Sequence, residues 1–172
     1  MSLTRDNSKV QEAIFSSLFP KHPYGTQTVL GTQENLKNPS ITNIKNYYKQ
    51  WYVPNNMAIC MSGDLDPDAT IALIDKYFGG LKPNPELPKL DLPKEAPITQ
   101  PVVKEVLGPD AESVALAWRF PGVSDKDFEI LQVVSQVLYN GKAGLIDLDL
   151  NQQQKVLNSY GYPMGLADYS AF

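Results

Sequence analysis

His22 and Cys60 are the only histidine and the only cysteine of the chain, so they are the first candidates for catalysis or metal binding. A typical zinc site needs three or four nitrogen, oxygen or sulfur ligands, and a catalytic cysteine or serine needs a base beside it. Nothing in the spacing brings such partners to His22, which precedes Pro23 as a turn-fixing residue would. We therefore expect no catalytic or metal-binding residue, with Cys60 buried as a small apolar side chain.

Three aspartates at alternate positions resemble the opening of a calcium loop: Asp64, Asp66 and Asp68. A loop of that kind requires glycine at its sixth position and glutamate at its twelfth, where this chain has Ala69 and Asp75. Asp66 followed by proline is instead typical of a helix start. We predict that these aspartates cap a helix.

The composition limits the class of protein. The chain has 172 residues, 42% of them hydrophobic, and a formal net charge of -4, which argues against a nucleic-acid groove. No apolar run approaches the roughly 20 residues that a membrane span needs, and no charged-then-apolar leader precedes Asp6. We expect a soluble protein of one or two domains. Its compartment would be bacterial-type periplasmic or cytoplasmic, and a single cysteine does not discriminate between the two.

The first half of the chain alternates helices with turns. Apolar spacing predicts a helix over residues 8–19, and residues 22–39 are predicted to be a surface excursion with little regular structure. Ser40 is expected to cap a second helix. The buried face of that helix would carry Ile41, Ile44, Tyr48 and Trp51.

A strand and a helix are predicted next. Residues 57–62 are apolar up to Ser62, which favours a strand buried on both faces. The Asp66-capped helix that follows ends at Gly79-Gly80, where we expect a left-handed C-terminal stop.

Six prolines between Leu81 and Pro101 favour a stiff, extended linker. We place the domain boundary there, with a first domain over residues 1–81, the linker over 82–101 and a second domain over 102–172. The predicted fold class is α+β, with layered α/β structure in which helices cover an antiparallel or mixed sheet.

The second half starts with strands. Residues 102–107 are a candidate edge strand, and residues 113–120 have a period of two. The large side chains on one face should pack under helices: Val114, Leu116, Trp118 and Phe120. The other face, with Ala115, Ala117 and Arg119, would line a chamber or contact a neighbouring layer.

Helices follow these strands. Ser124 is expected to start a helix whose buried stripe is Phe128, Leu131, Val134 and Leu138, and which ends at Asn140-Gly141. A more polar helix is predicted over residues 145–157. The tail over residues 160–172 is strand-like without a strand partner, so this domain is expected to be truncated and to self-associate through an apolar edge. Its tyrosines, Tyr160, Tyr162 and Tyr169, would line either a strand face or a peptide-binding surface.

Several motifs together resemble one family. They are His22-Pro-Tyr-Gly, Val29-Leu-Gly-Thr, Tyr47-Tyr48, Trp51-Tyr52, Pro54-Asn55-Asn56-Met57, Gly63-Asp64, Pro67 and Tyr77-Phe78-Gly79. This order is similar to the pitrilysin/insulinase-type zinc peptidases, the M16 family. The linker, residues 114–119 and the Lys142-Ala143-Gly144-Leu145 turn extend the resemblance over nearly the whole chain.

The resemblance implies a zinc site that lies outside this chain. Family members bind zinc through an H-x-x-E-H motif and a later glutamate, all upstream of the His-Pro-Tyr-Gly segment, and none is present here. Many active members also carry an arginine after a leucine to bind substrate, whereas Asn151 follows Leu150, and Tyr160 matches the family's substrate-binding tyrosine only in a shifted alignment. The chain would then hold the end of one peptidase-like domain and the start of the next.

Two functions follow from the resemblance. In the first, the chain is a non-catalytic portion of a zinc metalloendopeptidase that degrades or processes peptides in a chamber between paired domains. In the second, it belongs to a metal-free peptidase-like module that serves as a structural part or partner subunit. Both imply other M16-like domains, in the same chain or a partner, as its neighbours.

Overall fold

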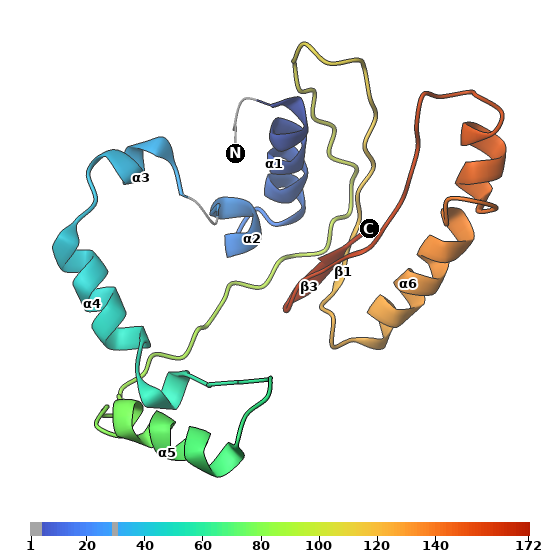
Figure 1. Cartoon of the computed structure of the whole chain (residues 1–172). Coiled ribbons are helices and arrows are strands. Elements are labelled where there is room, and N and C mark those ends of the chain that lie inside the picture. The colour runs from blue at the N-terminus through green and yellow to red at the C-terminus, as the bar shows by residue number, and fades with distance from the viewer. Residues whose placement is uncertain (1–4, 29–30) are drawn as a thin grey trace. The chain divides into compact units, whose positions relative to one another are not determined.

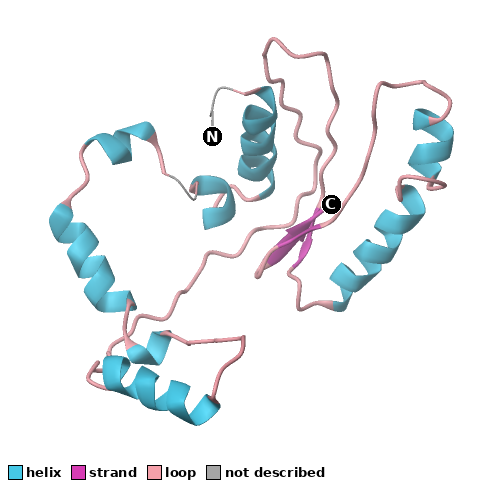
Figure 2. Cartoon of the chain, viewed as in Figure 1, coloured by secondary structure: helices cyan, strands magenta, loops and turns pink. Residues whose placement is uncertain are grey.

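The structure is a computed structural model that describes residues 5–28 and 31–172. Helices make up most of its regular structure, and the strands form one small antiparallel sheet (Figures 1 and 2). The chain divides into two compact units. The first unit contains the residues up to Gln27 together with Pro93–Phe172, and the second is Thr28–Leu92.

The first unit contains helices at both ends of its sequence and a sheet contributed by its C-terminal half. Its elements are α1 (Asp6–Leu18), α2 (Pro23–Thr26), β1 (Arg119–Pro121), α6 (Lys126–Leu138), the π-helical turn η2 (Asp147–Asn151), β2 (Met164–Gly165) and β3 (Tyr169–Ala171). The helix predicted over residues 8–19 is confirmed by α1.

The sheet has the strand order β1-β3-β2, and both pairings are antiparallel. Arg119 pairs with Ala171, and the ladder continues by one step because the backbones of Trp118 and Phe172 exchange hydrogen bonds of 2.9 and 3.0 Å. The prediction that the tail has no strand partner was therefore wrong. Its partner β1 lies about fifty residues upstream, beyond the reach of any local pattern.

The register also explains why most of the predicted strand over residues 113–120 is missing. Residues 113–117 precede the paired part of β1, and no described residue pairs with them, so they form no strand. The candidate edge strand over residues 102–107 is also absent, and these residues are irregular. Val114, Leu116 and Trp118 are exposed and do not pack under helices as predicted. Ala117, on the opposite face, packs against the core.

The core of the first unit lies between the end of α1 and β3. Leu18, Phe19 and Ala171 are buried there, with Tyr24 and Tyr169 packed against them. Strand side chains alternate between faces, so Tyr169 and Ala171 face this core while Ser170 faces the other way. On that second side, a Cβ at Gly165 would lie 2.6 Å from the ring of Phe128, so α6 packs against the sheet there.

The C-terminal helices start and stop at other residues than predicted. Asp125, not Ser124, caps α6, because its Oδ1 accepts a 2.9 Å bond from the N–H of Asp127. Leu131 is buried, but Val134 of the predicted stripe is exposed. The helix predicted over residues 145–157 ends at Asn151, and residue Gln154 has a positive φ of 52° that interrupts a further turn.

The second unit consists of α3 (Gln33–Lys37), α4 (Ile41–Trp51), the 3₁₀ turn η1 (Pro54–Asn56) and α5 (Pro67–Phe78). Both predicted caps are confirmed: Ser40 Oγ accepts from Asn43 N–H at 3.2 Å, and Asp66 Oδ1 accepts from Ala69 N–H at 2.9 Å. The surface excursion predicted over residues 22–39 instead contains α2 and α3.

Three other predictions for the second unit were wrong. Residues 57–62 form no strand and are exposed, Cys60 included. Ile41, Ile44 and Tyr48 of α4 are exposed, so the predicted buried face of this helix is not buried in the described structure. Gly79 ends α5 in a right-handed conformation, with φ of -61°. Val29 and Leu30 of the family motif lie outside the described residues.

Candidate functional site

His22 lies at the centre of a polar cluster in the first unit. Its side chain is 1% exposed and sits among aromatic rings, 4.2 Å from Tyr24 and 5.4 Å from Tyr169 between centroids. Its Nδ1 accepts a 3.3 Å hydrogen bond from the N–H of Tyr24 and so caps α2. Pro23 occupies the first helical position, so His22 directly precedes the helix. His22 therefore acts as the N-cap of α2 in addition to the predicted role of fixing a turn.

None of the residues that the structure describes forms a hydrogen bond with the second ring nitrogen of His22. Its Nε2 is buried and lies 3.6 Å from Asp168 Oδ2, which accepts a 3.2 Å bond from the Tyr24 hydroxyl. A neutral imidazole that accepts at Nδ1 carries its proton on Nε2. Zinc binding at Nε2 would move this proton to Nδ1 and break the cap of α2, and no three ligand side chains are grouped among the described residues, so His22 does not fit a zinc site.

Glu95 and Arg119 extend the cluster. Both are buried, with side chains 2% and 9% exposed, and Glu95 Oε2 lies 3.9 Å from Arg119 Nη1. Glu95 Oε1 also accepts hydrogen bonds of 2.6 and 2.7 Å from the N–H groups of Lys21 and His22. Arg119 therefore contacts residues of its own unit, Leu18, Glu95 and Ala96.

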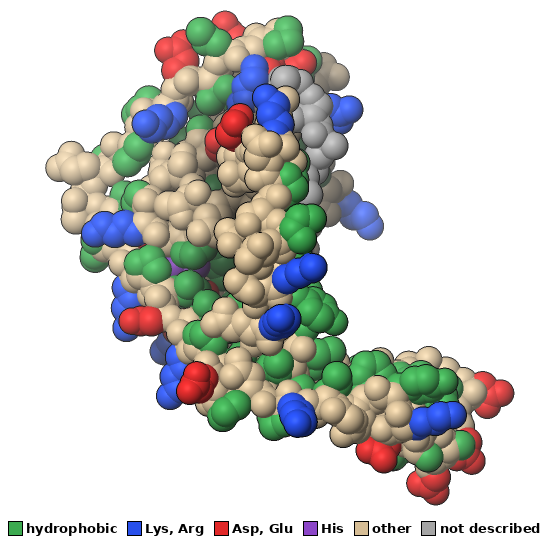
Figure 3. Space-filling model, turned by 90° about the vertical axis from the view of Figure 1, so that its left-hand side faces the viewer, with side chains coloured by type: hydrophobic (Ala, Val, Ile, Leu, Met, Phe, Trp, Pro, Cys, Tyr) green, Lys and Arg blue, Asp and Glu red, His purple; other side chains and the backbone are tan. Residues whose placement is uncertain are grey.

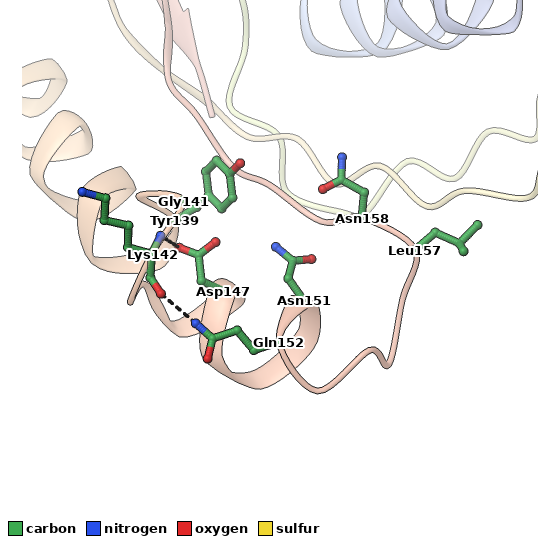
Figure 4. Close-up of a pocket in the computed structure, with 8 residues that line it drawn as sticks. All are labelled: Tyr139, Gly141, Lys142, Asp147, Asn151, Gln152, Leu157 and Asn158. Carbon is green, nitrogen blue, oxygen red and sulfur yellow. Dashed lines mark hydrogen bonds between the residues drawn. The ribbon is translucent and has the colours of Figure 1, made fainter.

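A polar pocket of about 350 Å³ lies where α6 gives way to η2 (Figure 4). At its base, Asp147 Oδ2 accepts hydrogen bonds of 3.0, 3.2 and 3.2 Å from the N–H groups of Asn140, Lys142 and Gly144. Burial works against the charged carboxylate, but the hydrogen bonds from Asn140, Gly144 and the Asn151 side chain outweigh it and lower the pKa of Asp147.

The polar groups of this pocket mostly bind one another. Gln152 Nε2 donates to Lys142 O at 2.8 Å, and the Asn151 side chain exchanges two bonds of 2.8 Å with the backbone of Ser159. Gly141 has a φ of 76° and makes the turn from which the N–H groups of Asn140, Lys142 and Gly144 reach Asp147. These hydrogen bonds stabilise the conformation of the loop between α6 and η2. The residues that line the pocket do not include a nucleophile hydrogen-bonded to a base.

The structure separates the remaining candidates. Cys60 belongs to the second unit and His22 to the first. Asp64 and Asp68 are exposed beside the cap residue Asp66. Tyr160 and Tyr162 stack at 6.0 Å and are exposed, whereas Tyr169 packs on Phe19 and His22. Among residues 5–28 and 31–172, no three histidine, cysteine, aspartate or glutamate side chains are grouped to hold a metal ion.

Sequence reasoning missed Glu95, Asp147 and Asp168. Glu95 lies among the linker prolines, where an acidic residue signals nothing, and its partners are 73 and 74 residues away. Asp147 had a usable signal, since an acidic residue close to an Asn-Gly turn can bind the turn's N–H groups.

Comparison with known proteins identifies the family. Residues 40–172 match the family model described as the Peptidase M16 inactive domain. That range covers more than half of the chain and includes the proline-rich segment. The chain belongs to the M16 peptidase family.

The resemblance inferred from the motifs is thus confirmed, and the M16 match is of the inactive-domain type. Zinc protease PqqE of Helicobacter pylori is 27% identical over 163 residues, which are 92% of this chain and 36% of that protein. The probable mitochondrial-processing peptidase subunit beta of Schizosaccharomyces pombe is 29% identical over 85 residues, 49% of this chain and 18% of that protein.

A solved structure shows the same fold. The crystal structure of a protease from Helicobacter pylori superposes with a TM-score of 0.68 at 22% identity, over 96% of this chain and 41% of that one. This M16 chain therefore spans 36% of the length of the Helicobacter pylori zinc protease and 41% of the solved protease chain. No helix among the described residues is long and apolar enough to cross a membrane.

Proposed function

We propose that this M16 chain is the non-catalytic portion of a longer zinc-dependent metalloendopeptidase, which degrades or processes peptides in a chamber between paired domains. The observation that carries the proposal is the match of residues 40–172 to the inactive M16 domain. Similarity to a zinc protease along 92% of the chain supports it. In this role the chain supplies wall and scaffold, and other M16-like domains supply the zinc ligands.

The proposed organisation keeps the end of one M16-like domain over residues 1–81, a linker over 82–101 and the start of another over 102–172. Completed domains would hold layered sheets covered by helices. Residues 57–62 and 113–116 support this, because they are apolar segments that lie exposed in this chain and that further layers would cover. The compartment, bacterial-type periplasmic or cytoplasmic, stays a prediction.

Metal analysis and a peptide-cleavage assay on the purified chain test the catalytic part of the proposal. We expect no stoichiometric zinc after dialysis and no hydrolysis of unfolded peptides, because His22 caps α2 and no metal-ligand group is found in the part of the chain that the structure describes. Zinc retained at one ion per chain, or cleavage abolished by a chelator, would contradict this.

A second candidate function is a metal-free partner subunit or structural module. The observation that favours it is the similarity to a protein named as a subunit, the mitochondrial-processing peptidase subunit beta. The upstream reading frame discriminates between the two. An H-x-x-E-H motif with a later glutamate supports the peptidase, and a frame that carries M16-like sequence without these residues supports the partner subunit.

A further inference from the structure

The chain between α1 and α2 presents two backbone donors to one carboxylate oxygen. The N–H groups of Lys21 and His22 both donate to Glu95 Oε1, at 2.6 and 2.7 Å. Such short bonds to an ionised acceptor are typical of charge-assisted contacts, which are stronger than neutral ones. The donors are fixed, because α1 ends at Leu18 and the His22 side chain caps α2 just beyond.

Arg119 supplies a positive charge to the same carboxylate. Its Nη1 lies 3.9 Å from Glu95 Oε2, and its guanidinium also donates to the carbonyl oxygens of Leu18 and Ala96. The guanidinium lies 5.5 Å from the ring centroid of Tyr169, and the Tyr169 hydroxyl accepts a 2.8 Å bond from the N–H of Glu95. The bond to Leu18 O holds the guanidinium from outside the proline-rich segment, and that segment contributes the Glu95 carboxylate and the carbonyl oxygen of Ala96.

We propose that Lys21 N–H, His22 N–H and the Arg119 guanidinium form a carboxylate-binding socket, which Glu95 fills from within the chain. Filling the socket fastens residues 93–97 to the rest of the first unit. A buried charge left without its partner is strongly unfavourable, so the socket retains affinity for a carboxylate when Glu95 is removed. Its ligand class is a small monocarboxylate, such as formate or acetate. This inference does not depend on the proposed peptidase function.

Chemical rescue of Glu95→Ala tests the socket. We expect the variant to lose thermal stability and to regain part of it in sodium acetate, compared with sodium chloride at the same ionic strength. Glu105→Ala is the matched control, because Glu105 is an exposed glutamate in the same unit. An acetate shift that is no larger in Glu95→Ala than in Glu105→Ala and the unsubstituted chain would overturn the proposal.

Amide hydrogen exchange gives a second test that does not require the alanine variant to fold. In the unsubstituted chain the Lys21 and His22 amides should be protected, and Glu95→Gln should speed their exchange by about ten- to a hundredfold through loss of the charged acceptor. Unprotected amides in the unsubstituted chain, or unchanged exchange in Glu95→Gln, would also overturn the proposal.

Discussion

The side chain of His22 stabilises the first unit in two ways. Its Nδ1 caps α2, and its ring packs against Tyr24, Phe19 and Tyr169. The two contributions can be separated, because asparagine offers an oxygen in place of Nδ1 but no ring.

We predict that His22→Ala lowers the free energy of unfolding more than His22→Asn does, by about 1 kcal/mol, the usual value of an N-cap. Both variants should be less stable than the unsubstituted chain, since both leave a cavity among the rings. Denaturant unfolding measures the difference. Equal stabilities of the two variants would show that the cap contributes nothing.

Asp147 makes the free energy of unfolding decrease as the pH falls into the acid range. Folding lowers the pKa of its carboxyl below the ordinary value of 3.8, so the folded state keeps the charge to lower pH than the unfolded state. The stabilisation is therefore fully present above pH 3.8 and is lost as the pH falls through the lower, folded pKa.

We predict that Asp147→Asn is less stable than the unsubstituted chain at neutral pH and loses less stability on acidification. Asp149→Asn, at an exposed position two residues on, is the control and should keep the acid dependence. Unfolding curves between pH 7 and pH 2 measure both. A variant with an unchanged acid slope would rule out this role for the carboxylate.

At the scale of elements, Gly25 allows α2 to fold back onto α1. A Cβ on this residue would lie 2.2 Å from the carbonyl oxygen of Phe19 and 2.5 Å from that of Phe15, and neither backbone atom can move easily. Gly25→Ala should therefore cost about 1–3 kcal/mol, the usual range for overpacking.

Gly80→Ala is the matched control for this prediction. A Cβ there would have no atom within 4 Å, and the backbone has no positive φ. We expect a gain of about 0.4–1 kcal/mol from the reduced freedom of the unfolded chain. Thermal unfolding measures both variants, and a Gly25→Ala chain as stable as Gly80→Ala would contradict the close approach.

Which elements could be predicted from sequence depends on how far apart their partners lie. The caps Ser40 and Asp66 bind N–H groups three residues away, so the local pattern was sufficient. The three-stranded sheet, by contrast, depends on the pairing of Arg119 with Ala171, and the carboxylate socket on a contact across 74 residues. Residues 57–62 have the composition of a buried strand, but burial requires a covering element that composition does not specify.

At the scale of the whole chain, apolar surface is unusually exposed. Val53 is the one buried hydrophobic side chain that the described part of the second unit contains, and hydrophobic side chains are spread over the face in Figure 3. In the first unit, Val114 is 89% exposed and Leu116 71%, at alternate positions beside Trp118. Exposed apolar segments of this kind, next to a sheet strand, favour association between copies.

We predict that the chain self-associates through residues 113–118, with an apparent mass in light scattering that rises with concentration. Lysines at Val114 and Leu116 should reduce the association, because they place charges on the apolar face. Lysines at Ser113 and Ala115 add the same charge to the opposite face and should reduce it less. A monomer at all concentrations would contradict the prediction, and equal effects of the two pairs would place the contact elsewhere on the chain.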